Sequence, residues 1–278
     1  MHSQADKEYI SNSVTRALQE DIGSGDVTAA LIPADHISQA RVITREPIVL
    51  CGCEWFEQTL QEIDETIAIH WHYQDGDIIA KNEMLCTLQG NSRNLLSGER
   101  TALNFLQTLS GVATLSRRYA DQVSDTKTQI LDTRKTIPGL RLELKYAVKT
   151  GGCKNHRTGL YDGILIKENH IQAAGGIVKA IQQAQKLKTG LFIEVEVESL
   201  DELRIAIDNG AERLLLDNFS LAQLEDAVKI NDNKASLEAS GGITLENISA
   251  VAATGVDWIS TGSLTKNIQA VDLSMLFE

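Results

Sequence analysis

Short apolar runs alternate with amphipathic stretches from about residue 129 to the end of the chain. Six runs have strand character and cover 129–132, 163–166, 191–197, 213–217, 236–239 and 257–260. The stretches between them place apolar residues at helical spacing and cover 139–150, 176–188, 200–210, 221–230 and 245–255. Strands that alternate with helices in this way predict βα units around a parallel sheet, an α/β fold. Six visible strands do not by themselves establish a full eight-stranded barrel.

The first hundred residues have a different pattern. Short strand-like segments separated by turns, such as that at 75–77, predict a small and mostly antiparallel α+β domain. A long helical stretch over 94–123 is expected to link this domain to the βα units. His70 and His72 share one face of a strand-like segment. Because no Cys or carboxylate stands at ligand spacing from them, we expect surface histidines, with a metal-binding pair as the weaker alternative.

The overall composition excludes several classes of protein. Hydrophobic residues make up 42% and charged residues 23% of the 278 positions, which is typical of a globular enzyme and excludes wholesale disorder. No apolar run approaches the roughly 18 residues that a membrane helix needs, and the first residues lack the apolar core of a signal peptide. Cys51 and Cys53 are separated by one residue, a spacing typical of neither a zinc pair nor a redox pair. We therefore expect a cytoplasmic protein that does not bind membranes.

Positive charge is concentrated in one segment of an acidic chain. The net charge is −12, which disfavours non-specific nucleic-acid binding. The segment from Arg134 to Glu168 is nevertheless +5, so the remainder is −17. A solvated basic helix face is the ordinary explanation of such a run. This segment also contains Pro-Gly, Gly-Gly and Asn-His-Arg, which a plain surface helix would not, so we expect it to bind a small polyanion.

Polar, charged or glycine residues follow every predicted strand. They are Thr133, Arg134 and Lys135; Lys167, Glu168 and Asn169; Glu196 and Glu198; Asp217 and Asn218; Ser240, Gly241 and Gly242; and Thr261, Gly262 and Ser263. A (β/α) barrel carries its active site at the carboxyl ends of its strands, so these positions are candidate site residues. The last two ends are small and glycine-rich, which is typical of a phosphate site formed by backbone N–H groups.

The acidic candidates each have more than one interpretation. Glu196 and Asp217 follow neighbouring strands and would hold a divalent metal, accept ribose hydroxyls or stabilise a developing cation. Glu194, Glu196 and Glu198 share one strand face, which usually means solvent, although a barrel strand cannot face solvent along its whole length. For Asp217 a helix N-cap is equally compatible with the sequence. Lys167 also stands where a Schiff-base aldolase would place its nucleophile. Cations, acids and a glycine-rich phosphate site together favour the transfer of a phosphorylated sugar.

Eight strings in order, from about residue 17 to the carboxyl terminus, resemble one enzyme family. They are ALQEDIGSGDVTAALIP, GERTALNFLQTLSGVATL, DTRKTIPGLR, LKYAVKTGG, NHRTGLYDGILIKENHI, EVEVESLDEL, LLLDNFS and SGGIT. The chain thereby resembles the quinolinate phosphoribosyltransferases, the decarboxylating nicotinate-nucleotide pyrophosphorylases. The third and fifth strings are long and specific.

The resemblance implies a fold and a reaction. A small N-terminal α+β domain over 1–105, joined by the C-terminal segment 266–278, would precede an incomplete (β/α) barrel with parallel strands over 106–265. The family transfers the phosphoribosyl group of phosphoribosyl pyrophosphate to quinolinate with Mg²⁺. The products are nicotinate mononucleotide, CO2 and pyrophosphate, a step of de novo NAD biosynthesis.

The resemblance also implies residue roles. Arg134, His156, Arg157 and Lys167 would bind the quinolinate carboxylates, with Lys135 near the phosphates. Glu196 and Asp217 would lie at the ribose and metal, and the catalytic set would be Lys135, Lys167, Glu196 and Asp217. The substrate-binding set would further include Thr133 and the phosphate residues Ser240, Gly241, Gly242, Thr261, Gly262 and Ser263. Arg100 would reach into the partner's site across the interface of a homodimer or a higher homo-oligomer.

Few positions depart from the family pattern. Cys153 stands where a third glycine is usual, and Thr261 and Ser263 replace the commoner Val and Ala. Three alternatives share these residues: a paralogue of altered specificity related to molybdenum transport, a non-catalytic sugar-phosphate-binding protein, and a Schiff-base lyase acting through Lys167. The complete set of cations disfavours the first, and the retained Lys167, Glu196 and Asp217 disfavour the second.

Overall fold

The computed structural model describes residues 4–278, which form two compact units. The first unit comprises the residues up to Thr114 together with the C-terminal segment Ile268–Glu278. The second unit comprises Leu115–Asn267. The long helix α3 (Ser92–Asp121) contributes residues to both. No helix within 4–278 is both long enough and apolar enough to cross a bilayer.

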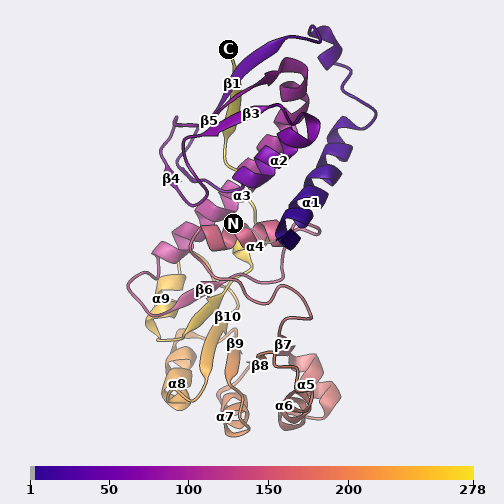
Figure 1. Cartoon of the computed structure of the whole chain (residues 1–278). Helices are drawn as coiled ribbons and strands as arrows, with labels where there is room; N and C mark the ends of the chain where they lie inside the picture. Colours follow the sequence, from indigo (N-terminus) through magenta and orange to yellow (C-terminus); the bar gives the residue numbers. More distant parts are fainter. Residues whose placement is uncertain (1–3) are drawn as a thin grey trace. The chain divides into compact units, whose positions relative to one another are not determined.

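The first unit is an antiparallel sheet with helices. Its four strands lie in the order β12-β1-β5-β3, so the last strand of the chain pairs with the first (Figure 1). The strand bounds are β1 Ile37–Thr44, β3 Ala68–Trp71, β5 Met84–Asn91 and β12 Leu273–Phe277, with a separate pair formed by β2 Ile48–Val49 and β4 Ile78–Ile79. The helices are α1 Gln4–Ile22, the 3-10 turn η1 Ala29–Leu31, α2 Cys53–Ile63 and α3. β1 alternates exposed and buried residues along most of its length, which is typical of a sheet with one face on the core. The expected small antiparallel α+β fold is confirmed.

The core of this unit fills the space between the sheet and two helices. Val42 of β1 and Leu88 of β5 pack with Phe56 of α2 and Leu103 of α3, all at most 2% exposed. His70 and His72 are exposed with their ring centroids 5.2 Å apart, which confirms them as surface histidines.

The second unit is built on a six-stranded sheet in which every pair is parallel. The strand order is β6-β11-β10-β9-β8-β7. The bounds are β6 Gln129–Leu131, β7 Ile164–Ile166, β8 Ile193–Val197, β9 Arg213–Asp217, β10 Ser236–Ser240 and β11 Trp258–Ser260. The three central residues of β9 and of β10 are all buried, as parallel strands require when both faces are covered. All six predicted strands are confirmed to within two residues at each end.

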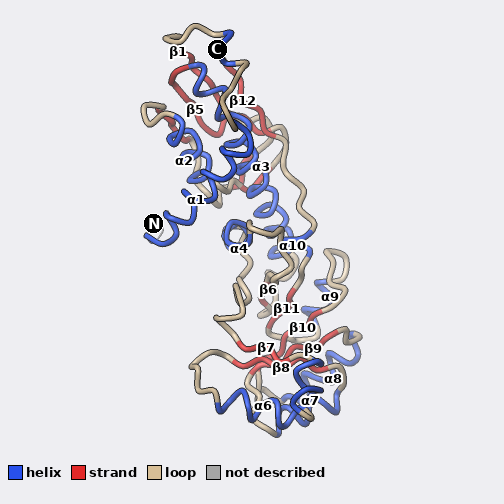
Figure 2. Tube along the Cα trace, turned by 90° about the vertical axis from the view of Figure 1, so that its right-hand side faces the viewer, coloured by secondary structure: helices blue, strands red, loops and turns tan. Residues whose placement is uncertain are grey.

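Helices follow the strands and present apolar faces to them. They are α4 Arg141–Thr150, α5 Glu168–Ala174, α6 Ile177–Lys186, α7 Leu200–Asp208, α8 Leu221–Asn231, α9 Ile248–Ala253 and α10 Ser263–Lys266. Figure 2 shows α6, α7 and α8 side by side along the strands. Ile181 on α6, Leu203 on α7 and Leu224 on α8 are at most 2% exposed. Ser199 and Ser220 cap the amino ends of α7 and α8, which fixes where these helices begin.

The barrel is open between β6 and β7, the two edge strands of the sheet. The connection between α4 and β7, residues 151–163, makes one parallel bridge to β6, between Leu131 and Lys154. This connection carries His156 and Arg157, so it brings two candidate site residues to the open side of the sheet. The expectation of an incomplete barrel with parallel strands is confirmed.

Candidate functional site

A cavity of about 420 Å³ opens at the carboxyl ends of the parallel strands in the second unit. It is lined by Thr133, Arg134, Lys135, His156, Arg157, Leu165, Lys167, Glu196, Leu215, Asp217, Glu238, Ser240 and Ser260. The structure thus brings together nine sequence-predicted site residues. Four of the lining side chains are Lys or Arg, so the cavity concentrates positive charge in an acidic protein.

Arg134 and Arg157 face the cavity from different segments. Arg157 donates from Nη1 to the carbonyl of Gly163 at 3.0 Å, which anchors one end of its fork. Burial and the neighbouring Arg134 lower the pKa of Arg157. Nε of Arg134 is buried and makes no hydrogen bond to any described residue. Two guanidinium groups close enough to repel each other, one with an unsatisfied donor, are typical of a site awaiting an anion.

Lys167 and Glu196 form an ion pair across the cavity. The Nζ–Oε2 distance is 2.9 Å, and the Lys167 side chain is 45% exposed while that of Glu196 is 9% exposed. Burial raises the pKa of Glu196, and the carboxylates of Glu168 and Asp217 act in the same direction, against the opposing effect of Lys167.

Asp217 ends β9 one strand away from Glu196. Its Oδ2 accepts a hydrogen bond from Nδ2 of Asn218 at 2.7 Å. The N-cap of the following helix is Ser220, so the N-cap interpretation of Asp217 is wrong. The two carboxylates come from neighbouring strands and repel each other enough to affect the pKa of Glu196. Carboxylate oxygens paired in this way fit the preferences of Mg²⁺, which takes one or two carboxylates together with phosphate oxygens.

The segment after β10 has the backbone of a tight turn. Gly241 and Gly242 have φ values of +98° and +63°. A Cβ at Gly241 would lie 2.2 Å from Oδ1 of Asn218, so only glycine fits beside that side chain. Ser240, the last residue of β10, lines the cavity, and consecutive residues with positive φ expose their N–H groups on one side.

The segment after β11 packs against the end of β6. Thr261 is buried, its N–H donates to the carbonyl of Leu131, and its hydroxyl accepts from the N–H of Ser263 at 3.2 Å. A Cβ at Gly262 would lie 3.0 Å from Cδ of Lys135. The structure therefore places Thr261, Gly262 and Ser263 behind Lys135 rather than among the residues that line the cavity.

His156 belongs to a buried network that the sequence reasoning missed. Its Nε2 lies 2.8 Å from Oε2 of Glu194, and its Nδ1 accepts from the N–H of Arg157 at 2.7 Å. Arg213 donates to Oε1 of Glu194 at 2.8 Å and to Oε2 of Glu238 at 2.6 Å. Both ring nitrogens of His156 are thus engaged by the protein, although the ring lines the cavity.

Only one member of this network, Glu194, could have been suspected from the sequence. Glu194 stands two residues before Glu196 on one strand face, and its side chain is 0% exposed. Single ligand atoms of His156, Glu194 and Glu238 lie within 4.8 Å of one another, which is metal-site spacing. The guanidinium of Arg213 already occupies both carboxylates and lies over the rings of Phe192 and Trp258, so the cluster is an ion network.

Four of the eight cations in the basic segment lie away from the cavity, and two of these four serve structure. Arg134, Lys135, Arg157 and Lys167 line the cavity. Lys145 is 2% exposed and pairs with the fully buried Asp132, and the two groups hold the His156 backbone through its carbonyl and its N–H. Arg141 donates to the carbonyls of Thr158 and Arg134. Lys149 and Lys154 are exposed. The expected anion site is therefore made by four of the eight cations.

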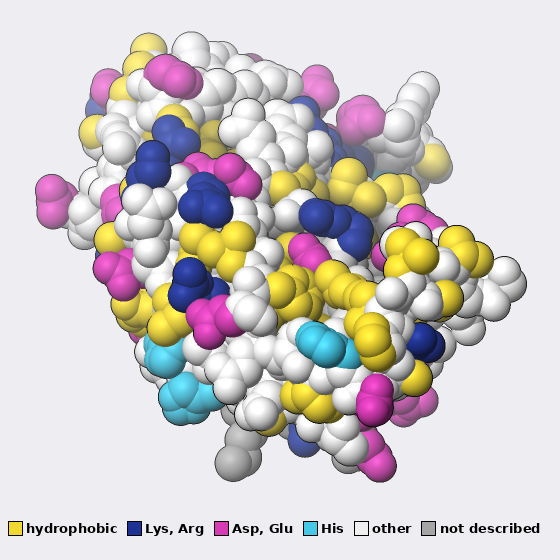
Figure 3. All heavy atoms as spheres, turned by 90° about the horizontal axis from the view of Figure 1, so that it is seen from above, with side chains coloured by type: hydrophobic (Ala, Val, Ile, Leu, Met, Phe, Trp, Pro, Cys, Tyr) yellow, Lys and Arg dark blue, Asp and Glu magenta, His cyan; other side chains and the backbone are white. Residues whose placement is uncertain are grey.

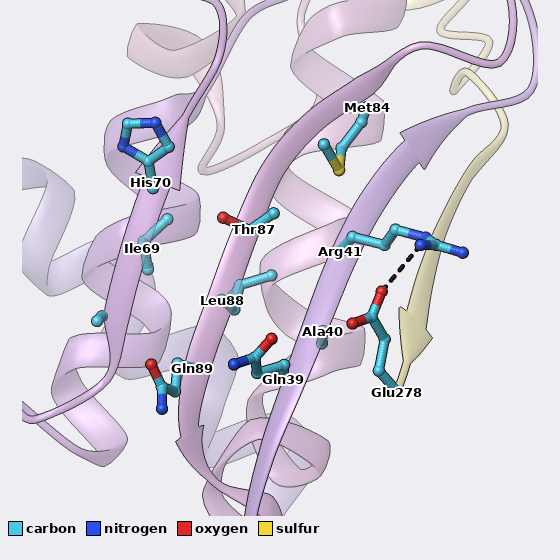
Figure 4. Close-up of a pocket in the computed structure, with 11 residues that line it drawn as sticks. Gln39, Ala40, Arg41, Ile69, His70, Met84, Thr87, Leu88, Gln89 and Glu278 are labelled. Carbon is cyan, nitrogen blue, oxygen red and sulfur yellow. Dashed lines mark hydrogen bonds and ion pairs between the residues drawn. The ribbon is translucent and has the colours of Figure 1, made fainter.

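Arg100 lies in the first unit, exposed on α3. That unit has its own cavity of about 430 Å³ on the sheet, lined by residues that include Gln39, His70 and Thr87 (Figure 4). The ion pair drawn there joins Arg41 to Glu278 at 2.8 Å, so the two side chains add no net charge to this cavity.

The molecular face in Figure 3 mixes Lys and Arg with Asp, Glu and hydrophobic side chains, unlike the dense basic surface of a nucleic-acid-binding protein.

Comparisons with known proteins identify the family of the chain. Residues 26–110 match the family model for the N-terminal domain of quinolinate phosphoribosyl transferase, and residues 112–276 match that for its C-terminal domain. A Bacillus subtilis protein named probable nicotinate-nucleotide pyrophosphorylase (carboxylating) is 41% identical over 257 residues, which are 92% of this chain and 89% of that protein. The structure of the nicotinate-nucleotide pyrophosphorylase from Francisella tularensis is 47% identical, with a TM-score of 0.96 over 98% of this chain and 97% of that one. The chain therefore belongs to the quinolinate phosphoribosyltransferase family.

Proposed function

We propose that the cavity of the second unit is where this phosphoribosyltransferase of NAD biosynthesis joins its two substrates. The ring nitrogen of quinolinate attacks C1′ of phosphoribosyl pyrophosphate, and pyrophosphate leaves. The carboxylate next to the ring nitrogen then leaves as CO2, which gives nicotinate mononucleotide. The observation that carries the proposal is the set of four cations from three chain segments that line one cavity together with Glu196 and Asp217.

The cations suit a dicarboxylate. Arg134, Arg157 and Lys167 would bind the two carboxylates of quinolinate, because guanidinium forks grip a carboxylate with two parallel hydrogen bonds. A substrate with one carboxylate would leave part of this charge buried and unpaired, so the site discriminates against nicotinate. His156 would border the ring and fix the direction of Arg157 through its backbone N–H.

The acids suit the ribose. Departure of pyrophosphate leaves positive charge on the ribose ring, and Glu196 and Asp217 would stabilise that charge. The same two carboxylates would hold Mg²⁺, which neutralises pyrophosphate as a leaving group when bound. Lys135, Thr133, Ser240, Gly241 and Gly242 would receive the phosphates, with Thr261, Gly262 and Ser263 supporting Lys135 from behind.

Decarboxylation needs no covalent bond to the protein. Once the ring nitrogen carries the ribose it is cationic, so the electron pair left by CO2 is stabilised on the adjacent carbon until that carbon takes a proton. Lys167, held by Glu196, then acts as a fixed charge. The protein contributes orientation and electrostatics.

The active assembly would be a homodimer or a multiple of it, with Arg100 reaching the partner's site. A cytoplasmic location stays a prediction from the sequence.

An assay with quinolinate, phosphoribosyl pyrophosphate and Mg²⁺ tests the function by following CO2 and nicotinate mononucleotide. Quinolinate should turn over, and nicotinate, the matched mono-acid control, should not. Turnover of both acids at similar kcat/KM would contradict the dicarboxylate site. Turnover of neither in a folded sample would contradict the function.

A further inference from the structure

Lys167 begins helix α5 at a position where lysine is disfavoured. It is the N-cap residue, with an extended backbone at φ −112° and ψ 168°. Helices favour Ser, Thr, Asp or Asn at this position, because a side-chain oxygen can accept from the free N–H groups of the first turn. The ammonium group of Lys167 has no acceptor, and it pairs with Glu196 at 2.9 Å. The side chain of Lys167 therefore serves the cavity and cannot cap the helix.

Two neighbouring helices of the same unit begin with a conventional cap. The hydroxyl of Ser199 accepts from the N–H of Glu202 at the start of α7. In α8 the hydroxyl of Ser220 accepts from the N–H of Gln223, and Oε1 of Gln223 accepts in return from the N–H of Ser220 at 2.9 Å. The returned bond is half of a capping box, and it fixes the N-cap backbone from the third residue of the helix.

His170 makes the returned bond in α5. It is the third residue of the helix, and its Nδ1 accepts from the backbone N–H of Lys167 at 3.0 Å. It thus occupies the position that Gln223 has in α8. The His170 side chain is exposed and is not among the residues that line the cavity. The first turn of α5 therefore holds the backbone of Lys167 while the Lys167 side chain faces the cavity.

We propose that His170 is a positioning residue for Lys167, its imidazole fixing the backbone from which the ammonium group reaches the dicarboxylic acid. This inference rests on the proposed function, in which Lys167 binds a carboxylate of quinolinate. It adds to that function a residue that acts through Lys167 and does not touch the substrate.

The position of the Lys167 ammonium depends on few contacts. The side chain is long and 45% exposed, and its ion pair is with Glu196. The backbone is bonded into α5 at both polar groups, since the N–H donates to His170 and the carbonyl accepts from the N–H of Ile171 at 3.0 Å. Without the imidazole the N–H bond is lost, so the N-cap backbone samples more conformations and the ammonium is less often in place for a carboxylate.

Calorimetric titration of quinolinate into the full-length protein tests the inference. His170→Ala should raise Kd about fivefold, the factor that corresponds to the loss of a typical capping bond. His170→Gln should bind within about twofold of the wild type, because Gln223 makes the same bond at the same helix position in α8. Gln172→Ala, at an exposed position of α5, is the control and should leave Kd unchanged.

Two further measurements separate positioning from a general disturbance of the helix. KM for phosphoribosyl pyrophosphate should stay within about twofold in His170→Ala, because its phosphates are assigned to other residues. In a Lys167→Ala background, His170→Ala should change the Kd for quinolinate less than about twofold, because the ammonium that His170 positions is absent.

Three results would overturn the inference while leaving the proposed function intact. They are wild-type binding by His170→Ala, binding by His170→Gln as weak as that of His170→Ala, and a fivefold loss that persists in the Lys167→Ala background. A wild type that neither binds nor turns over quinolinate would overturn both the inference and the proposed function.

Discussion

At the scale of single residues, some side chains of the cavity are available to bind a substrate, whereas others orient their neighbours. Arg134 and Arg157 present guanidinium donors, and Nε of Arg134 has no hydrogen-bond partner within residues 4–278. His156 has both ring nitrogens engaged, so its part is to fix the N–H of Arg157 and to close one wall. In the proposed reaction, a substrate carboxylate would meet charges that are in place before it binds, which would reduce the cost of reorganisation.

Replacing Arg157 with Ala removes a half-buried cation that a substrate carboxylate would pair with. We expect kcat/KM for quinolinate to fall about a hundredfold, roughly 2.7 kcal/mol, with most of the change in KM. Steady-state kinetics measures this, and Lys149→Ala, an exposed cation of the same basic segment, is the control. An unchanged kcat/KM for Arg157→Ala would exclude Arg157 from the dicarboxylate site.

Replacing Gly241 with Ala combines strain with a steric clash. The residue has a φ of +98°, and the new Cβ would lie 2.2 Å from Oδ1 of Asn218. We expect a loss of about 1–3 kcal/mol in the free energy of unfolding and a raised KM for phosphoribosyl pyrophosphate. The control is Gly242→Ala, where φ is +63° but nothing lies within 4 Å of the new Cβ. Equal effects of the two changes on urea unfolding and KM would show that the contact with Asn218 does not matter.

At the scale of elements, the strands were predictable because their pattern is local. The apolar run of β9 matched its observed bounds, and glycine-rich ends marked β10 and β11. The ion network inside the barrel was not predictable. Glu194, Arg213 and Glu238 lie on three different strands, and nothing in the sequence of one strand indicates that its charged residue finds a partner on the next. For the same reason, the sequence analysis counted Lys145 among the cations of the basic segment, although it is buried against Asp132.

The Lys145–Asp132 pair connects helix α4 to the connection that carries His156. Lys145→Met would leave the fully buried Asp132 without its cation, which typically costs about 3–5 kcal/mol. Because Asp132 and Lys145 also hold the His156 backbone, the KM for quinolinate should rise as well. Urea unfolding and kinetics measure the two effects. Lys149→Met, one turn along the same helix and exposed, should change neither. A Lys145→Met protein within about 1 kcal/mol of the wild type would contradict this role.

At the scale of the whole molecule, the candidate residues are divided between two units of one chain. Nearly all of them belong to the second unit, and Arg100 belongs to the first. Four cations line the cavity of the second unit, whereas the chain as a whole has a net charge of −12, so we expect negative substrates to be attracted to the cavity and repelled by acidic surface elsewhere. Association rates of both substrates should therefore fall as salt is added.

Mixing two inactive variants tests whether the site is shared between subunits. If Arg100 acts across the interface of a homodimer, equal amounts of Arg100→Ala and Lys167→Ala should recover about a quarter of wild-type activity, because half of the dimers are mixed and each mixed dimer has one intact site. Subunit exchange is first verified with differently tagged chains. Each variant mixed with itself is the control. Demonstrated exchange without recovery would mean that Arg100 serves its own subunit or none.

The buried thiol of Cys153 can report how often the segment that carries His156 and Arg157 opens. The thiol is 3% exposed and donates to the carbonyl of Ser116 at 3.2 Å, and burial raises its pKa to about 12. A buried thiol with a raised pKa reacts with alkylating reagents only when the residues around it move apart and expose it. The rate at which Cys153 is labelled therefore measures how often this segment opens locally. Saturating quinolinate should lower the labelling rate, because a bound substrate would hold the segment in its closed conformation.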